Sequence, residues 1–256
     1  MKTKLAFFGL FFIILSLVVA AAPESPDKIT VTSNGRNSKN SGSTISQQAQ
    51  AGNVTGLIVN YTRITEAWQG YFGNVTGAIV LDDANNFTLY DWQMASPLGE
   101  IYASNGSSVT WSKVYCMNTS SNRNVNGSST NPNNVFYNIN ASQIELNFGI
   151  SQTDTDGLSE TFNDTFTSSF STGSVGIDTT DGCSSAHPYT DEFYSNAWDE
   201  LLLSDNNSII FTALLEQNQN GFQPGSETFD FQLMVLENGH LSDTAATPYY
   251  FFVELS

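Results

Sequence analysis

The sequence predicts an all-β protein, an antiparallel β-sandwich of Greek-key or jelly-roll-like order with long Asn/Ser-rich loops and an extended N-terminal segment. Three observations lead to this class. Short runs rich in β-branched and aromatic residues alternate with clusters of Gly, Asn, Ser and Asp, as strands alternate with turns. Apolar residues seldom recur at helical spacing. The runs are short and closely spaced, as in sandwiches.

The chain begins with the three parts of a secretory signal. Lys2 and Lys4 precede an apolar run over residues 5–19, and three alanines follow it. We expect cleavage after Ala20 or Ala21, no membrane span afterwards, and an extracellular or cell-surface location. The alternative is an uncleaved anchor, because the run is only slightly shorter than the roughly 20 residues that cross a bilayer. The expected organisation is a signal peptide (1–21), an extended segment or linker (22–46) and one β-sandwich (47–256).

Several runs are predicted to be strands. The clearest hairpin places residues 101–104 and 107–111 on either side of Asn105-Gly106, a pair that suits a two-residue turn. Residues 229–235 alternate as in a half-buried strand. Two short helices are predicted, one opening at residues 142–145 with a capping box and one over residues 158–162. The other predicted strands are residues 28–33, 54–61, 66–72, 75–81, 87–92, 113–116, 166–177, 198–203, 208–215 and 249–255.

One sequence occurs twice. Gly-Asn-Val-Thr-Gly-Leu-Ile-Val at residues 52–59 returns as Gly-Asn-Val-Thr-Gly-Ala-Ile-Val at residues 73–80. Two copies are too few for a solenoid. We expect two strands that enter the sheet through the same turn; the alternative is that both copies present a glycan.

The formal net charge is −17, although only 13% of the residues are charged. No cluster of Lys and Arg predicts binding to nucleic acid. Residues 28–65 carry four basic and no acidic side chains, a charge of +4, whereas residues 66–256 carry 2 basic and 23 acidic ones, so 2 − 23 = −21. This asymmetry indicates that the leading segment lies either on its own acidic body or on that of a neighbouring copy.

Covalent features are expected at two kinds of site. Cys116 and Cys183 form a disulfide in an exported protein, or else remain as two buried thiols. Asn-x-Ser/Thr sequons make glycosylation a further expectation. The candidates for N-glycosylation are Asn53, Asn74, Asn105, Asn118 and Asn126.

No motif predicts catalysis. His187 and His240 lie far apart in the sequence, and neither a nucleophile elbow nor a phosphate-binding Gly loop is present. Asp154 and Asp156 precede Gly157 in a pattern that suits calcium, with a solvated acidic turn as the alternative. No other cofactor is expected. A glycoside hydrolase stays a minor alternative because it needs only two suitably spaced acids.

Aromatic residues allow a second hypothesis. Trp68, Tyr90, Trp92, Tyr102 and Trp111 would stack on sugars if exposed, or form the core if buried, and the core is the favoured interpretation.

Four stretches of the chain resemble a group of exported archaeal proteins of unassigned function. They are residues 49–55, 68–77, 90–92 and 95–104, with Trp-Gln-Gly-Tyr-Phe-Gly-Asn-Val-Thr-Gly at residues 68–77. The resemblance implies an archaeal source and a cell-surface setting, with no catalytic residues to transfer.

A looser likeness is to β-sandwich filament subunits that donate an N-terminal strand. Ile29 and Val31 share one face of residues 28–33 and are the donor candidates. We therefore expect a non-catalytic surface protein, a filament or sheath subunit whose partners are further copies of itself or other surface proteins and glycans. The alternative is a carbohydrate-binding or adhesive module.

Overall fold

The structure is a computed structural model that describes most of the chain after the predicted signal. The described residues are 22–35, 46–60, 62, 64–93, 98–119, 141–151, 153–189, 198–223, 227–237 and 246–255. Within them the fold is all-β with antiparallel pairing and few helical turns, as predicted. Asn126, His240 and the signal segment lie outside the described residues.

The strands are mostly short. They are β1 (Trp68–Gly73), β2 (Ala78–Asp82), β3 (Thr88–Gln93), β4 (Gly99–Ser104), β5 (Tyr115–Cys116), β6 (Asp164–Thr165), β7 (Phe170–Thr172), β8 (Val175–Ile177), β9 (Ser184–Ala186), β10 (Glu200–Ser204), β11 (Ile209–Leu214), β12 (Gln219–Asn220), β13 (Thr228–Phe229), β14 (Phe231–Leu236) and β15 (Tyr250–Leu255). The helices are α1 (Ala141–Asn147), α2 (Leu158–Thr161) and the 3-10 turn η1 (Trp111–Lys113).

A seven-stranded sheet forms the centre of the body. Its order is β15-β4-β11-β10-β9-β6, and β5 pairs with β10 beside this path. Both faces of the sheet are buried, because successive residues of its strands belong to two different cores. In β10, Leu202 packs with Phe211 on one face, and Leu201 and Leu203 pack with Tyr102 on the other. Burial on both faces explains why Leu201 to Leu203 in β10 and Ile209 to Phe211 in β11 are continuous apolar runs.

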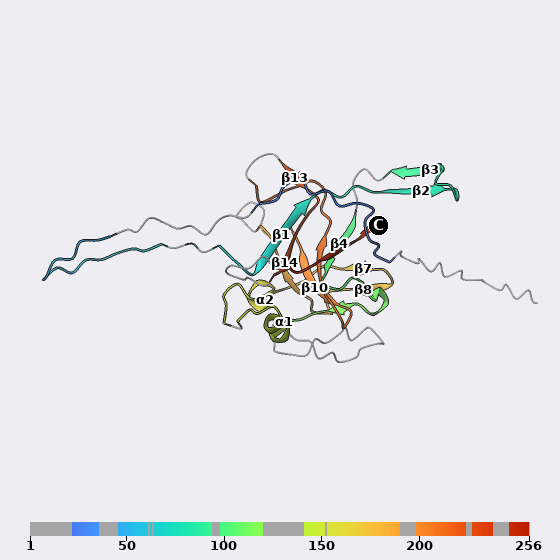
Figure 1. The fold of residues 1–256 in the computed structure, drawn as a ribbon. Helices are drawn as coiled ribbons and strands as arrows, with labels where there is room; N and C mark the ends of the chain where they lie inside the picture. Colours follow the sequence, from blue (N-terminus) through green and yellow to red (C-terminus); the bar gives the residue numbers. More distant parts are fainter. Residues whose placement is uncertain are drawn as a thin grey trace, which may run out of the picture.

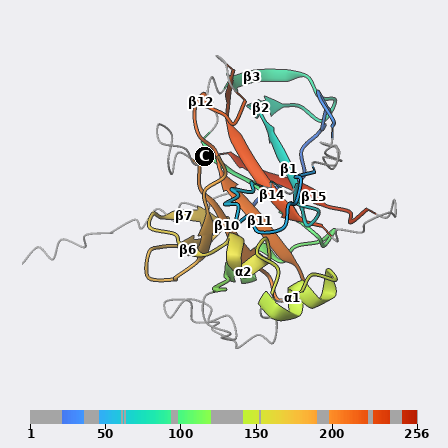
Figure 2. The same ribbon diagram turned by 90° about the vertical axis from the view of Figure 1, so that its left-hand side faces the viewer.

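Smaller elements cover the two faces. On one face β14 packs against β11 and β10 and pairs with β1, and α1 and α2 close one end of this layer (Figure 2). On the other face the β7–β8 hairpin and η1 cover the second core. This arrangement of layers fixes where the segments that project from the body begin.

The predicted disulfide is confirmed. Cys116 on β5 is bonded to Cys183, which lies just before β9, and their Cα atoms are 4.8 Å apart. Both cysteines are buried in the second core. The bond ties two short strands to the centre of the sheet across a sequence separation of 67 residues.

Several local predictions were wrong. Residues 166–177 are not one strand and contain the β7–β8 hairpin. Residues 28–33 and the described residues of 54–61 are not strands, since no strand in the described part of the chain pairs with them. The Asn105-Gly106 hairpin does not form, because β4 pairs with the distant strands β11 and β15 and Asn105 Oδ1 accepts the Ile209 N–H at 3.0 Å. Strand β14 is buried on both faces, including Gln232.

The two short helices are present, with one difference in capping. Glu145 lies within α1 and bonds to another helix. Its Oε1 accepts the N–H groups of Leu158 at 2.9 Å and Ser159 at 3.2 Å, so it joins α1 to the first turn of α2. Glu145 is buried, and these two bonds offset the cost of burying it.

Candidate functional site

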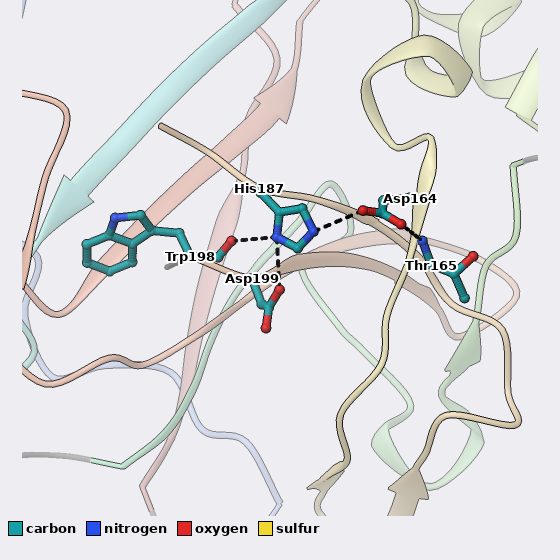
Figure 3. A network of polar contacts seen from close by, with 5 residues as sticks. All are labelled: Asp164, Thr165, His187, Trp198 and Asp199. Atoms are coloured by element: carbon teal, nitrogen blue, oxygen red, sulfur yellow. Dashed lines mark hydrogen bonds and ion pairs between the residues drawn. The ribbon is translucent and has the colours of Figure 1, made fainter. Parts of the chain in front are cut away.

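A polar cluster surrounds His187, a residue from which the sequence predicted no chemistry (Figure 3). Its Nε2 lies 3.3 Å from Asp164 Oδ2, and its Nδ1 lies 3.1 Å from both the Trp198 carbonyl oxygen and Asp199 Oδ1. Carbonyl and carboxylate oxygens only accept hydrogen bonds, so all these contacts are satisfied together when both ring nitrogens carry a proton.

The two carboxyls of this cluster differ in environment. The hydrogen bond from the Thr165 N–H lowers the pKa of the exposed Asp164 below its ordinary value, and His187 lowers it further. Burial raises the pKa of Asp199, although His187 opposes that shift. The cluster connects β6, the end of β9 and the start of β10. We interpret it as a clamp on the edge of the sheet.

A second acidic group lies inside the body. Glu100 on β4 and Glu254 on β15 face each other across the ladder, with the Tyr102 hydroxyl 3.4 Å and 3.2 Å from them. The Gly173 N–H donates to both Glu254 oxygens, at 3.0 and 2.9 Å. Burial, and then Glu254, raises the pKa of Glu100 to about 8. Because both acids are buried beneath the β7–β8 turn, a polysaccharide has no access to this pair.

The predicted calcium residues accept hydrogen bonds from the protein itself. Asp154 Oδ2 accepts the Ser151 N–H at 3.0 Å, and Asp156 Oδ2 accepts the Thr65 hydroxyl at 2.6 Å. Among the described residues, no group of three or more His, Cys, Asp or Glu side chains is arranged to hold a metal ion. Calcium binding at Asp154 and Asp156 therefore stays a prediction.

The sequons differ in accessibility. Asn53, Asn74 and Asn105 are exposed, although Asn105 Oδ1 already accepts a backbone hydrogen bond. Asn118 is half-buried and its amide donates to the Gly182 carbonyl at 2.9 Å, which leaves its nitrogen poorly placed to carry a glycan. Asn53 and Asn74 are the better candidates on these grounds.

The first copy of the repeat lies in a projecting segment, which we call the arm and define as residues 46–60. Figure 1 shows the arm running away from the body and returning to the start of β1. The turn at its tip is closed by the Asn53 N–H to the Gln50 carbonyl, and every described side chain of the arm is exposed. Ile58 is 93% exposed, and Val54, Leu57 and Val59 are also exposed.

The second copy of the repeat leads into the β2–β3 hairpin, which projects from the body at the other end of β1 (Figure 1). Ile79 faces Trp92 and Leu81 faces Tyr90, and all four side chains are about half exposed or more. Asp83 Oδ1 accepts the N–H groups of Asn85 and Phe87, which shapes the turn. The hairpin thus presents an apolar face and carries no third strand among the described residues.

The base of the hairpin is attached firmly to the body. The Val75 N–H donates to Asp230 Oδ2 at 3.0 Å, and the Asp230 N–H donates to the Gly73 carbonyl at 2.9 Å. Gly77 packs closely on the Leu255 side chain, which a side chain at position 77 would displace. The same turn sequence is anchored in one copy of the repeat and fully exposed in the other.

The residues just after the predicted signal lie on their own body. Glu24 forms a two-way backbone bridge with Val253 on the edge of β15, at 3.0 and 2.8 Å. The donor candidates Ile29 and Val31 follow this bridge, and they are 60% and 74% exposed. Part of the leading segment is therefore held in place, and the side chains of the next part are exposed.

The aromatic residues separate into two groups. Tyr102 is buried, and Trp68 packs against Phe162 and Phe211 while its Nε1 donates to the Asp156 carbonyl at 2.7 Å. Tyr90 and Trp92 remain exposed with their ring centroids 4.7 Å apart. Tyr102 and Trp68 thus pack in the core as expected, whereas Tyr90 and Trp92 do not.

No model of a protein family, no curated protein and no solved structure matches this chain. In the described part of the chain, no helix is both long enough and apolar enough to cross a membrane. The class that the fold defines is an all-β body with two exposed apolar projections, the arm and the β2–β3 hairpin.

Proposed function

We propose that this chain is a non-catalytic, exported cell-surface protein, a filament or sheath subunit that assembles by donating a strand from the segment before β1. The observation that carries the proposal is the exposure of apolar, strand-forming side chains in the arm and the β2–β3 hairpin. Exposed edges and apolar patches of this kind mark interaction surfaces, and soluble monomers normally avoid them.

Other observations support the same proposal. The segment before β1 is basic in its sequence, and the body is strongly acidic, so the segment of one copy is attracted to the body of another. The likeness of residues 68–77 to exported archaeal proteins supports the surface setting. The polar clusters at His187 and Glu100 are saturated or buried, which favours a structural role over catalysis.

Removal of residues 22–60 is expected to convert assemblies of the mature protein into single copies. The deletion takes away the exposed apolar segments before β1 and leaves every strand from β1 to β15. Negative-stain microscopy and light scattering check the result, with near-ultraviolet circular dichroism as the folding control. A full-length mature protein that stays monomeric at high concentration, or a deletion variant that still polymerises, contradicts the proposal.

A carbohydrate-binding or adhesive module is the second candidate, and one observation favours it. Tyr90 and Trp92 form an exposed pair on β3, and such rings stack on sugars. Trp92→Ala is expected to abolish binding to a glycan array and the associated change in tryptophan fluorescence. Trp68→Phe, within the body, is the matched control. An intact protein that binds no glycan removes this candidate.

A further inference from the structure

We infer that residues 52–59 of one copy add as a third strand to the free edge of β3 in a second copy. This inference rests on the proposed function and identifies the donor and the acceptor. Its starting point is the repeat, because the last three residues of the second copy, Ala78 to Val80, already pair with β3.

In the second copy of the repeat, β2 lies antiparallel to β3, with Ile79 opposite Trp92 and Val80 opposite Asp91. Residues 52–59 have the same pattern, in which Ile58 corresponds to Ile79 and Val59 to Val80. A strand with this pattern therefore carries side chains that β3 is already seen to accept. Strand β3 then lies between two copies of one sequence, its own β2 and the neighbour's arm.

The arm and the β2–β3 hairpin each lack a strand partner among the described residues, and each can provide one for the other. The arm has exposed apolar side chains and no strand partner among the described residues. The hairpin has two strands, and two-stranded sheets are marginal in water unless a third strand or a covering layer is added. Backbone hydrogen bonds between the arm and β3 provide affinity, and the alternating side chains provide register.

The position of the two segments indicates a second copy as the partner. The arm leads into the start of β1, and the hairpin follows the end of β1, so the two project from opposite ends of this strand (Figure 1). An arm that reaches the hairpin of the next copy makes a head-to-tail contact. Such contacts leave one free arm and one free hairpin at the ends and generate open filaments.

Charge around the arm is compatible with this contact. The arm itself carries no charged side chain, and the nearest basic residues in the sequence are Lys39 and Arg63, whereas the hairpin carries Asp82, Asp83 and Asp91. Attraction between the basic residues that flank the arm and these carboxylates favours contact between copies, and salt weakens it.

Two variants of the mature full-length protein test the inference. The first, Ile58→Pro with Val59→Pro, removes two adjacent backbone N–H groups from the arm. Adjacent N–H groups point to opposite edges of a strand, so the variant cannot donate at either edge. The second, Leu89→Pro with Tyr90→Pro, removes two adjacent N–H groups from β3, the acceptor strand. The control, Ile29→Pro with Thr30→Pro, makes the same change in the other exposed segment. All six positions are exposed, so the melting temperature of the body is expected to stay within about 2 °C.

Each of the first two variants is expected to be a single copy in light scattering, and the control is expected to assemble as the unmodified protein does. An equimolar mixture of the arm variant and the hairpin variant is expected to form dimers and no larger assembly. The intact arm of one variant binds the intact hairpin of the other, and no further functional pair remains.

Three results overturn the inference. If the unmodified protein assembles and the arm variant also does so, the donor is wrong while the proposed function stands. If the control loses assembly and the arm variant keeps it, Ile29 and its neighbours are the donor. If the unmodified protein never assembles, the proposed function and this inference fail together.

Discussion

Replacement of both Cys116 and Cys183 by Ala is expected to lower the free energy of unfolding by about 4 kcal/mol, because the disulfide closes a long loop in the unfolded chain. The sequence separation is 67 residues, and the bond lies in a core without access to solvent. For a body of this size the loss corresponds to a fall in melting temperature of about 10 °C. Denaturant titration of the mature protein measures it.

Reductant provides the control for the disulfide prediction. Adding a thiol reductant under unfolding conditions should lower the stability of the unmodified protein by a similar amount and leave the double variant unchanged. Equal stability of the two proteins without reductant would show that the cysteines are free thiols in solution.

Stability is expected to fall as the pH rises from 5 to 8. Burial raises the pKa of Glu100 to about 8, and it also raises the pKa of Glu200 and of Glu254. At a pH between the ordinary pKa of a Glu side chain and the raised pKa of Glu100, the folded protein holds a proton that the unfolded chain releases. The stabilisation of the folded state by this proton is therefore complete below about pH 4.5 and is lost as the pH rises through about 8. The expected loss of unfolding free energy between pH 5 and pH 8 is about 3 kcal/mol.

Amide substitutions test the origin of this pH dependence. Glu100→Gln keeps an oxygen for the Tyr102 hydroxyl and cannot ionise, so it is expected to flatten the pH profile and stabilise the protein at pH 8. Glu200→Gln keeps an acceptor for the Met234 N–H, now 2.9 Å from Glu200, and should act in the same direction. Glu227→Gln changes an exposed carboxyl and should leave the profile as it was. A flat or rising profile in the unmodified protein would mean that the buried acids are charged in the folded state.

The buried acids also show a limit of local sequence patterns. In a strand with one solvated face, an alternating Glu is expected to point into water. Glu100, Glu200 and Glu254 are all buried, because other layers cover both faces of the seven-stranded sheet. Nothing within a few residues of any of them indicates that cover.

Pairing across the sheet was beyond local prediction for a similar reason. Asn105-Gly106 has the composition of a hairpin turn, yet β4 pairs with β11 and β15, which lie more than 100 residues later in the sequence. Burial of β4 between two apolar strands outweighs the local preference of a two-residue turn. The His187 cluster was missed in the same way, since Asp164 is brought to it only by the pairing of β6 with β9.

The sequence by itself determined the class of this protein. Period and composition predicted the antiparallel all-β fold, β1, β10, β11 and β15 close to their observed places, two short helices and the disulfide. These features depend on side-chain alternation, on turn residues and on a single pair of cysteines. Each is readable within a short stretch of chain.

The tertiary structure alone decided which copy of the repeat became a strand. Residues 73–80 lead into β2 because Asp230 and Leu255 hold their start and β3 follows to pair with them. Residues 52–59 have nearly the same sequence and stay exposed. A strand needs hydrogen-bonding partners outside itself, so identical residues differ wherever the chain places a partner beside one copy and none beside the other.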